Sequence, residues 1–166
     1  MVKWVLFVVV GLIVLVGVVA LIGMLLPKGH RASRAVVYSA TPDAVFAAIS
    51  DFATFPQWRS DVTAVEILSN DAGLTRFREV GRNGAVIYTV EVREPASRLV
   101  TRIDDPSQPF GGSWTLLVRP VAGGTELTIT EEGEIYNPIF RVMSKLFFSP
   151  DTTIDTYQAD LRKRLG

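Results

Sequence analysis

The chain has 166 residues, enough for one domain of ordinary size, and carries 17 basic and 17 acidic side chains. All 17 acidic residues follow position 33, whereas Lys3, Lys28 and Arg31 precede it, which leaves 14 basic residues beyond that point. This balance offers no basic surface for nucleic acid. The sequence has no cysteine, which excludes disulfide frameworks, zinc knuckles and thiol nucleophiles.

An uninterrupted apolar segment lies near the amino terminus. No charged residue occurs from Trp4 to Leu26, and at about 1.5 Å per residue a helix of this length covers a hydrocarbon core of about 30 Å. A cleaved signal peptide is the alternative, but its apolar region is typically about 7–15 residues long, and no small-x-small cleavage site follows here. We therefore predict that residues 1–27 form a single-pass membrane anchor.

Basic residues flank this anchor unequally, with Lys28, Arg31 and Arg34 after it against Lys3 and the amino terminus before it. The positive-inside rule then places the following domain in the cytoplasm. We predict a short basic tether at 28–33 and one folded domain at 34–166.

Alternating and short apolar runs predict seven strands in this domain, at residues 34–39, 62–68, 74–81, 85–93, 98–104, 112–119 and 125–135. Between the first two strands, Thr41-Pro42-Asp43 combines a cap, a proline at the first helical position and an acidic first turn. The aromatic segment from Phe52 to Trp58, which contains Pro56, then predicts a second short helix or a turn.

The carboxy-terminal segment from Asn137 to Leu165 predicts a long amphipathic helix. Its apolar residues recur at helical spacing: Ile139, Phe140, Met143, Leu146, Phe147, Ile154, Tyr157, Leu161 and Leu165. Pro150 predicts a kink, or a restart capped by Ser149, through which the apolar face keeps its phase. We predict an α+β fold in which a curved, seven-stranded antiparallel sheet grips this helix.

Period-two alternation along the strands predicts which side chains face the helix. The concave face receives Phe77, Glu79, Val86, Tyr88, Val90, Val92, Trp114, Leu116, Val118, Leu127, Ile129, Glu131 and Ile135. The outer face receives Arg76, Arg78, Arg93 and Arg119.

The order of these elements resembles the START-like (SRPBCC) superfamily, in particular its polyketide cyclase/dehydrase branch with the helix-grip fold of birch pollen allergens. The resemblance covers residues 34–166 and rests on the element order with Thr41-Pro42-Asp43, Asp51-Phe52, Phe55-Pro56-x-Trp58, Phe110-Gly111-Gly112-Ser113-Trp114 and the segment 124–133. It implies an apolar cavity between sheet and helix, which holds lipids, sterols, polyketides or plant hormones in various members.

On this resemblance, side chains of the concave face and of the last helix are candidates for binding an apolar ligand: Phe77, Glu79, Tyr88, Val90, Trp114, Leu116, Ile129, Glu131, Phe140, Met143 and Phe147. The alternative for each apolar residue alone is an ordinary place in the core. Phe147 and Phe148, beside Pro150, are candidates for a lip at the cavity entrance.

Catalytic groups are few. The single histidine, His30, falls in the predicted tether, so no imidazole is expected inside the cavity. No HExxH pattern and no glycine-rich phosphate loop occurs, so we expect neither a metal nor a cofactor. Glu79 and Glu131 remain as weak catalytic candidates, because a carboxyl that faces an apolar cavity has a raised pKa suited to acid–base work. The alternative is that both lie near strand ends and face water.

Three functions are consistent with these features. The first is a membrane-tethered protein that binds an apolar or amphipathic small molecule, such as a lipid, isoprenoid or polyketide-like compound. The second is a cyclase or hydratase acting on a polyketide-like substrate with Glu79 or Glu131. The third is a protein-interaction module at the membrane that holds no small ligand.

Overall fold

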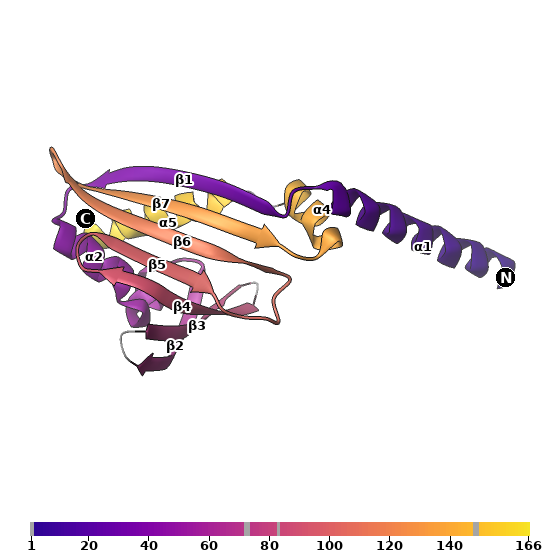
Figure 1. Cartoon of the computed structure of the whole chain (residues 1–166), viewed down its shortest axis with the longest axis horizontal. Helices are drawn as coiled ribbons and strands as arrows, with labels where there is room; N and C mark the ends of the chain where they lie inside the picture. The colour runs from indigo at the N-terminus through magenta and orange to yellow at the C-terminus, as the bar shows by residue number, and fades with distance from the viewer. Residues whose placement is uncertain (1, 72–73, 83, 148–149) are drawn as a thin grey trace.

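The protein forms one antiparallel sheet with its helices on one side and a long amino-terminal helix that projects from one end (Figure 1). The structure is a computed structural model that describes residues 2–71, 74–82, 84–147 and 150–166, with the backbone alone at 147 and 150. Its elements in chain order are α1 (Val2–Leu25), β1 (Gly29–Tyr38), α2 (Pro42–Ser50), the 3-10 helix η1 (Phe52–Thr54), α3 (Phe55–Trp58), β2 (Val62–Asp71), β3 (Leu74–Gly81), β4 (Gly84–Glu94), β5 (Arg98–Ile103), β6 (Phe110–Val121), β7 (Gly124–Ile135), α4 (Pro138–Phe147) and α5 (Pro150–Leu165).

The sheet has the strand order β1-β7-β6-β5-β4-β3-β2, and every neighbouring pair is antiparallel. Strands β2 to β7 therefore form a continuous meander, and β1 closes the sheet beside β7. Two short α-helices, with η1 between them, separate β1 from β2. This arrangement confirms the predicted α+β fold and its seven strands.

Helix α5 lies across the concave face and supplies the centre of the core (Figure 1). Ile154, Tyr157 and Leu161 recur at helical spacing and are at most 5% exposed, so they bury one stripe of α5 against the sheet. The hydroxyl of Tyr38 in β1 donates to the main-chain oxygen of Gln158 at 3.1 Å, which fixes the helix along the strand. The grip of the sheet on the last helix is therefore confirmed for α5.

The last helix restarts at Pro150, which is one of the two outcomes predicted for this position. The segment before the restart differs from the prediction, because α4 packs against the end of α1 instead of continuing along the sheet. Pro150 removes a backbone donor at the break, and the apolar surface of α1 offers α4 another partner. The predicted cap at Ser149 and the predicted lip at Phe148 lie outside the described residues.

Strand β1 begins five residues earlier than predicted. Residues 29–33, expected in a basic tether, pair in register with β7, from Gly29 opposite Glu134 to Ser33 opposite Thr130. This segment contains basic residues and no apolar alternation, so the sequence pattern did not predict a strand. It lies beside the acidic end of β7, where Arg31 forms an ion pair with Glu132 at 3.6 Å. Opposite charges on facing strands stabilise such a pairing, so only the few residues between Leu25 and Gly29 connect α1 to the sheet.

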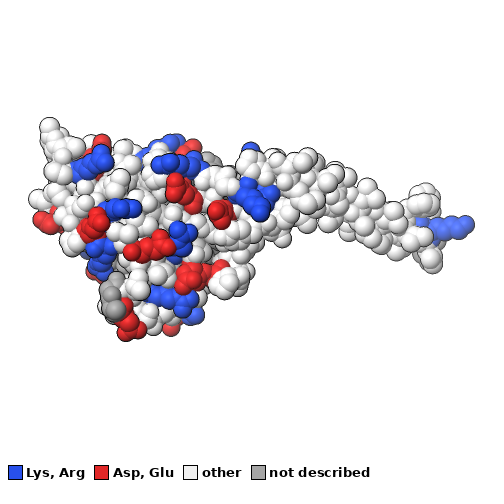
Figure 2. Space-filling model, in the orientation of Figure 1, with Lys and Arg blue, Asp and Glu red and all other residues white. Residues whose placement is uncertain are grey.

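Helix α1 is long and apolar enough to cross a membrane. Figure 2 shows no charged atoms along the middle of α1, and its described residues are exposed except Val19 and Ala20, which are half-buried, and Gly23, which is buried. It lies near the amino terminus, where either a membrane anchor or a signal sequence is found.

Candidate functional site

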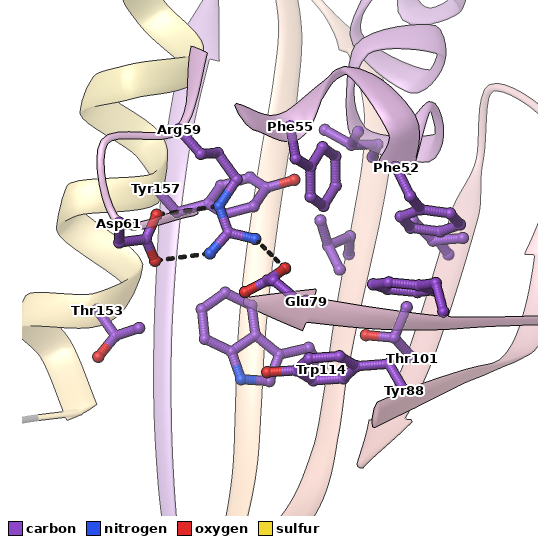
Figure 3. A pocket seen from close by; sticks show the side chains of 14 residues that line it. Phe52, Phe55, Arg59, Asp61, Glu79, Tyr88, Thr101, Trp114, Thr153 and Tyr157 are labelled. Atoms are coloured by element: carbon purple, nitrogen blue, oxygen red, sulfur yellow. Dashed lines mark hydrogen bonds and ion pairs between the residues drawn. The ribbon is translucent and has the colours of Figure 1, made fainter. Parts of the chain in front are cut away.

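A cavity of about 120 Å³ lies between the concave face of the sheet and the helices. Helices α2, α3 and α5, with η1, cover it, and strands β3 to β6 form its floor (Figure 3). Its apolar walls are Ile49, Phe52, Phe55, Phe77, Leu99, Trp114 and Leu116. Its polar contributions are Arg59, Asp61, Glu79, Tyr88, Thr101, Thr153 and Tyr157.

One wall of the cavity is a stack of three aromatic rings. Phe77 lies between Phe52, at a ring-centre distance of 4.2 Å, and Tyr88, at 5.3 Å, with interplanar angles of 14° and 19°. These rings come from η1, β3 and β4, so the stack joins the helical cover to the sheet. Phe77 is only 2% exposed, and the stack forms a rigid wall.

The opposite end of the cavity contains a buried ion-pair cluster centred on Arg59 (Figure 3). Nη1 of Arg59 donates to Oε2 of Glu79 at 2.7 Å, while Nε and Nη2 donate to the two oxygens of Asp61 at 3.2 and 2.7 Å. Side-chain exposure is 9% for Arg59, 14% for Glu79 and 41% for Asp61. One buried cation therefore serves two carboxylates, and its guanidinium also lies over the rings of Phe55 and Tyr157.

The position of Arg59 follows from the short helix before it. Helix α3 ends at Trp58, and the main-chain N–H of Arg59 donates to the carbonyl of Phe55 at 2.8 Å. Arg59 thus follows Phe55 by four residues, the spacing at which side chains of one helical face meet. The next residue is held by α5, because the main-chain N–H of Ser60 donates to Oδ2 of Asp160 at 2.7 Å.

Burial dominates the electrostatics of this cluster. Burial raises the pKa of Glu79 above the usual carboxyl range, although Arg59 opposes the rise. Burial also raises the pKa of Tyr88 and of Tyr157. For Arg59 burial acts in the opposite direction, but the charge of Glu79 and the pairing with Asp61 outweigh it and raise the pKa. The cavity therefore presents a permanent cation, a carboxyl group paired with it whose pKa is raised by burial, and two phenols whose pKa is also raised.

The structure brings together only part of the set of side chains predicted to bind a ligand. Phe77, Glu79, Tyr88, Trp114 and Leu116 line the cavity. The remaining predicted residues lie elsewhere: Val90 and Ile129 in the packed core, Glu131 farther along the concave face, Phe140 stacked on Phe110 at 6.0 Å, and Met143 on the exposed side of α4. The side chain of Phe147 lies outside the described residues.

His30 lies in β1 and not in a tether, and its side chain is on the concave face of the sheet. Nε2 of His30 is 3.2 Å from Oε1 of Glu131, and Glu131 pairs opposite Trp114, so it shares the face that carries the cavity. The ring of His30 lies over Gly133, where a Cβ would overlap it. The other oxygen of Glu131 is buried without a hydrogen-bond partner among the described residues. The pair does not line the cavity.

Arg93 was predicted on the outer face of the sheet, and its position differs from that prediction. A bulge between Val90 and Val92 shifts the phase of β4, so that Arg93 pairs opposite the cavity residue Leu99 and turns toward the helices. Its Nη2 donates to the carbonyl of Ser50 at the end of α2, at 3.3 Å.

The polar cluster of the cavity did not follow from the sequence patterns. Arg59 and Asp61 were not singled out, and Tyr157 was assigned only to the helical stripe. The available signal was a cation four residues after Phe55 and two before an acidic residue, which is the spacing for an arginine stacked on an aromatic ring. Among the described residues, no three histidine or acidic side chains gather in a way that could hold a metal ion.

The architecture agrees with comparisons to known proteins. The sequence profile of the family described as polyketide cyclase / dehydrase and lipid transport matches residues 29–163. The chain therefore belongs to this family of the START-like superfamily. As the description names both polyketide enzymes and lipid transport, the family handles hydrophobic small molecules. No protein among those with curated functions matches the sequence.

Solved structures share the fold at low sequence identity. A START superfamily protein from Mycobacterium smegmatis is similar with a TM-score of 0.64 and 19% identity, over 82% of this chain and 97% of that one. A protein from Thermus thermophilus gives 0.61 and 22%, over 82% and 96%. The di-domain ARO/CYC StfQ from the steffimycin biosynthetic pathway gives 0.66 and 10%, over 83% of this chain and 50% of that one.

Proposed function

We propose that the protein binds an apolar or amphipathic small molecule between the sheet and α5, and that α1 tethers it to a membrane. The observation that carries the proposal is the cavity, which combines apolar walls with one buried ion-pair cluster at its end. Pockets for small molecules have this form, with a few fixed polar groups that orient the ligand. Arg59 and Tyr88 would receive the polar end of the ligand, and the ring stack of Phe52 and Phe77 its apolar part.

The volume of the cavity limits the size of the ligand that it can hold. About 120 Å³ is below the roughly 300–1,000 Å³ of ordinary ligand pockets and close to the roughly 150 Å³ cavity that accommodates benzene. The cavity therefore suits one ring or one chain end. A longer ligand would extend past Thr153, an exposed residue of α5 that borders the cavity.

Two adjacent threonines offer a matched test. Thr153 borders the cavity, whereas Thr152 is also exposed but does not. We expect mass spectrometry of the detergent-extracted chain to detect a co-purifying small molecule in the wild type and in Thr152→Trp, and to lose it in Thr153→Trp. If both variants keep the molecule, the molecule is not bound in the cavity. If neither variant nor the wild type carries one, thermal stabilisation by a lipid extract becomes the test, and no shift would contradict binding.

The tether is part of the same proposal. An uncleaved α1 with the domain on the cytoplasmic side predicts that the membrane fraction contains the intact chain, including residues 2–25. Because the native chain has no cysteine, a single Ser69→Cys variant supplies a unique thiol in β2. We expect a membrane-impermeant maleimide to label it only after the cells are opened. Labelling of intact cells would place the domain outside, and a chain that starts after α1 would make α1 a signal sequence.

An enzymatic role is the second candidate, because burial raises the pKa of Glu79 at the cavity wall. A protonated Glu79 could act as a general acid in a cyclisation or dehydration of a polyketide-like substrate. Glu79→Gln would then abolish turnover and leave binding intact. The alternative candidate for this role, Glu131, pairs with His30 outside the cavity lining, so Glu131→Gln tests it separately. Equal loss of binding in Glu79→Gln would make Glu79 a recognition group.

A further inference from the structure

Helix α4 is docked along the last two turns of α1. Gly23 is buried in this contact. The residues around it on the same side are half-buried: Val19 and Ala20 in α1, and Leu26 just after it. A Cβ at Gly23 would overlap the carbonyl oxygen of Pro138, the first residue of α4. The absence of a side chain at this position therefore permits the close approach of the two helices.

Arg141 fixes this arrangement from inside. Its side chain is buried, with the residue 4% exposed. Nη1 donates to the carbonyls of Gly23 at 2.6 Å and Leu26 at 3.1 Å, which lie at the carboxy-terminal end of α1. Nε and Nη2 donate to the carbonyl of Ile135 at 3.2 and 2.9 Å, and Nη2 also reaches that of Tyr136 at 3.4 Å. One guanidinium thus caps α1 and joins it to the end of β7, so α4 has a fixed position relative to α1.

The face of α4 turned away from these contacts is apolar. Ile139, Met143 and Leu146 follow one another at steps of four and three residues and are 39%, 43% and 68% exposed. They form one continuous stripe on the helix. Lys145, in the last turn of α4, is exposed. Lys28 and Arg31 lie where α1 joins the sheet, and Figure 2 shows basic atoms at this junction.

The position of α4 along α1 sets its depth. The 24 residues of α1 extend about 36 Å, which exceeds a hydrocarbon core of about 30 Å, so one end of α1 reaches into the headgroup region. Because α4 lies beside the last two turns, it occupies the boundary between headgroups and acyl chains. Its apolar stripe then continues the exposed apolar surface of α1, and its basic neighbours lie at the level of anionic headgroups.

We propose that α4 is an interfacial membrane helix, with the stripe of Ile139, Met143 and Leu146 inserted into the leaflet beside α1. The occupant of this surface is the lipid bilayer itself. Amphipathic helices of this kind bury their apolar face about 5–10 Å into the interface. The inference rests on the proposed tether, and it adds a second contact that holds the sheet at a fixed orientation to the bilayer.

Site-specific labels on the full chain separate the two claims. Three single-cysteine variants, each carrying an environment-sensitive fluorophore, are reconstituted into vesicles of phosphatidylcholine and phosphatidylglycerol: Leu12→Cys in α1, Met143→Cys in α4 and Thr152→Cys on the exposed side of α5. Lipids with a nitroxide placed either near the headgroup or deep in the acyl chain then quench the labels. We expect deep quenching at position 12, shallow quenching at position 143 and none at position 152.

Each alternative pattern has a clear meaning. Quenching at position 12 without quenching at position 143 overturns the interfacial helix and keeps the tether. The absence of quenching at both positions overturns the tether and with it this inference. A third pattern would assign the stripe to a second copy of the protein and likewise overturn the proposal. In that pattern the unlabelled Met143→Cys chains form a disulfide with one another, and lipid nitroxides do not quench the labelled Met143→Cys chain.

Discussion

Arg59 and Glu79 form a buried ion pair in which Nη1 and Oε2 are 2.7 Å apart. The two residues come from opposite layers of the molecule, since Arg59 follows α3 and Glu79 lies in β3. The pair therefore holds the helical cover against the sheet at the end of the cavity. Asp61, more exposed, takes the other edge of the same guanidinium.

Removing this cation should destabilise the fold. Arg59→Ala takes away the only cation that the described residues place within hydrogen-bond distance of Glu79. Breaking a buried pair in this way typically costs roughly 3–5 kcal/mol. Thermal unfolding of the detergent-solubilised full chain, followed by tryptophan fluorescence, measures the loss.

The double variant Arg59→Ala/Glu79→Gln is its control, because it removes the uncompensated charge as well. It should recover much of the stability. If it is as unstable as the single variant, Arg59 contributes mainly by stacking on Phe55 and Tyr157.

Glu131 should make stability depend on pH. Burial raises its pKa, and the hydrogen bond from His30 opposes the rise. Because the pKa is higher in the folded state, the folded protein binds the proton more tightly, and the free energy of unfolding falls as the pH rises through the raised pKa. Glutamine does not titrate, so Glu131→Gln should be more stable than the wild type near neutral pH, with a difference that shrinks on acidification.

Unfolding temperatures of both proteins from about pH 4, near the reference carboxyl value, to about pH 8 test this expectation. Glu132→Gln is the matched control, because Glu132 is the next residue and its ion pair with Arg31 is exposed, where such pairs contribute little. A similar gain in both variants would show that burial of Glu131 is not the cause.

The sequence predicted those parts of the fold that have a strong local period. The strands from β2 to β7 alternate or have clear turns, and the stripe of Ile154, Tyr157 and Leu161 in α5 has only one surface to pack on. These features depend on residues close together in the chain. The cavity wall at Phe77 and Trp114 followed from the same alternation.

The features that were missed depend on partners distant in the sequence. His30 lies in a strand that pairs with β7, where Gly133 is opposite it and Glu131 is within hydrogen-bond distance, and Arg93 changes side because Glu91 lies in a bulge. Helix α4 leaves the sheet because Gly23, more than a hundred residues earlier, admits it to α1. Arg59 becomes a site residue only when β3 brings Glu79 to it. Local periodicity contains none of these contacts.

Gly23 should be intolerant of a side chain. In Gly23→Ala the new methyl group overlaps the carbonyl of Pro138, so α1 and α4 must separate and the contacts of Arg141 with Gly23 and Leu26 weaken. Overpacking of this kind costs about 1–3 kcal/mol. Gly17→Ala is the control, because nothing lies within 4 Å of a Cβ at Gly17. We expect a lower unfolding temperature for the first variant only, and equal behaviour would contradict close docking of α4 on α1.

Phe77 should carry much of the stability of the cavity wall. Its ring is stacked on both sides, by Phe52 and Tyr88, and Phe77→Ala would open a hole at the joint between η1 and the sheet. Such truncations cost roughly 3–5 kcal/mol. Ile67→Ala is the matched control, because Ile67 pairs with Phe77 across β2 and β3 but is 45% exposed, where substitutions typically change stability by less than about 0.5 kcal/mol.

Benzene should restore part of the stability of Phe77→Ala by filling the new space, as it fills other apolar cavities, and should leave Ile67→Ala unchanged. A loss of stability in Phe77→Ala no larger than that in Ile67→Ala would mean that the ring stack does not hold the helical cover to the sheet.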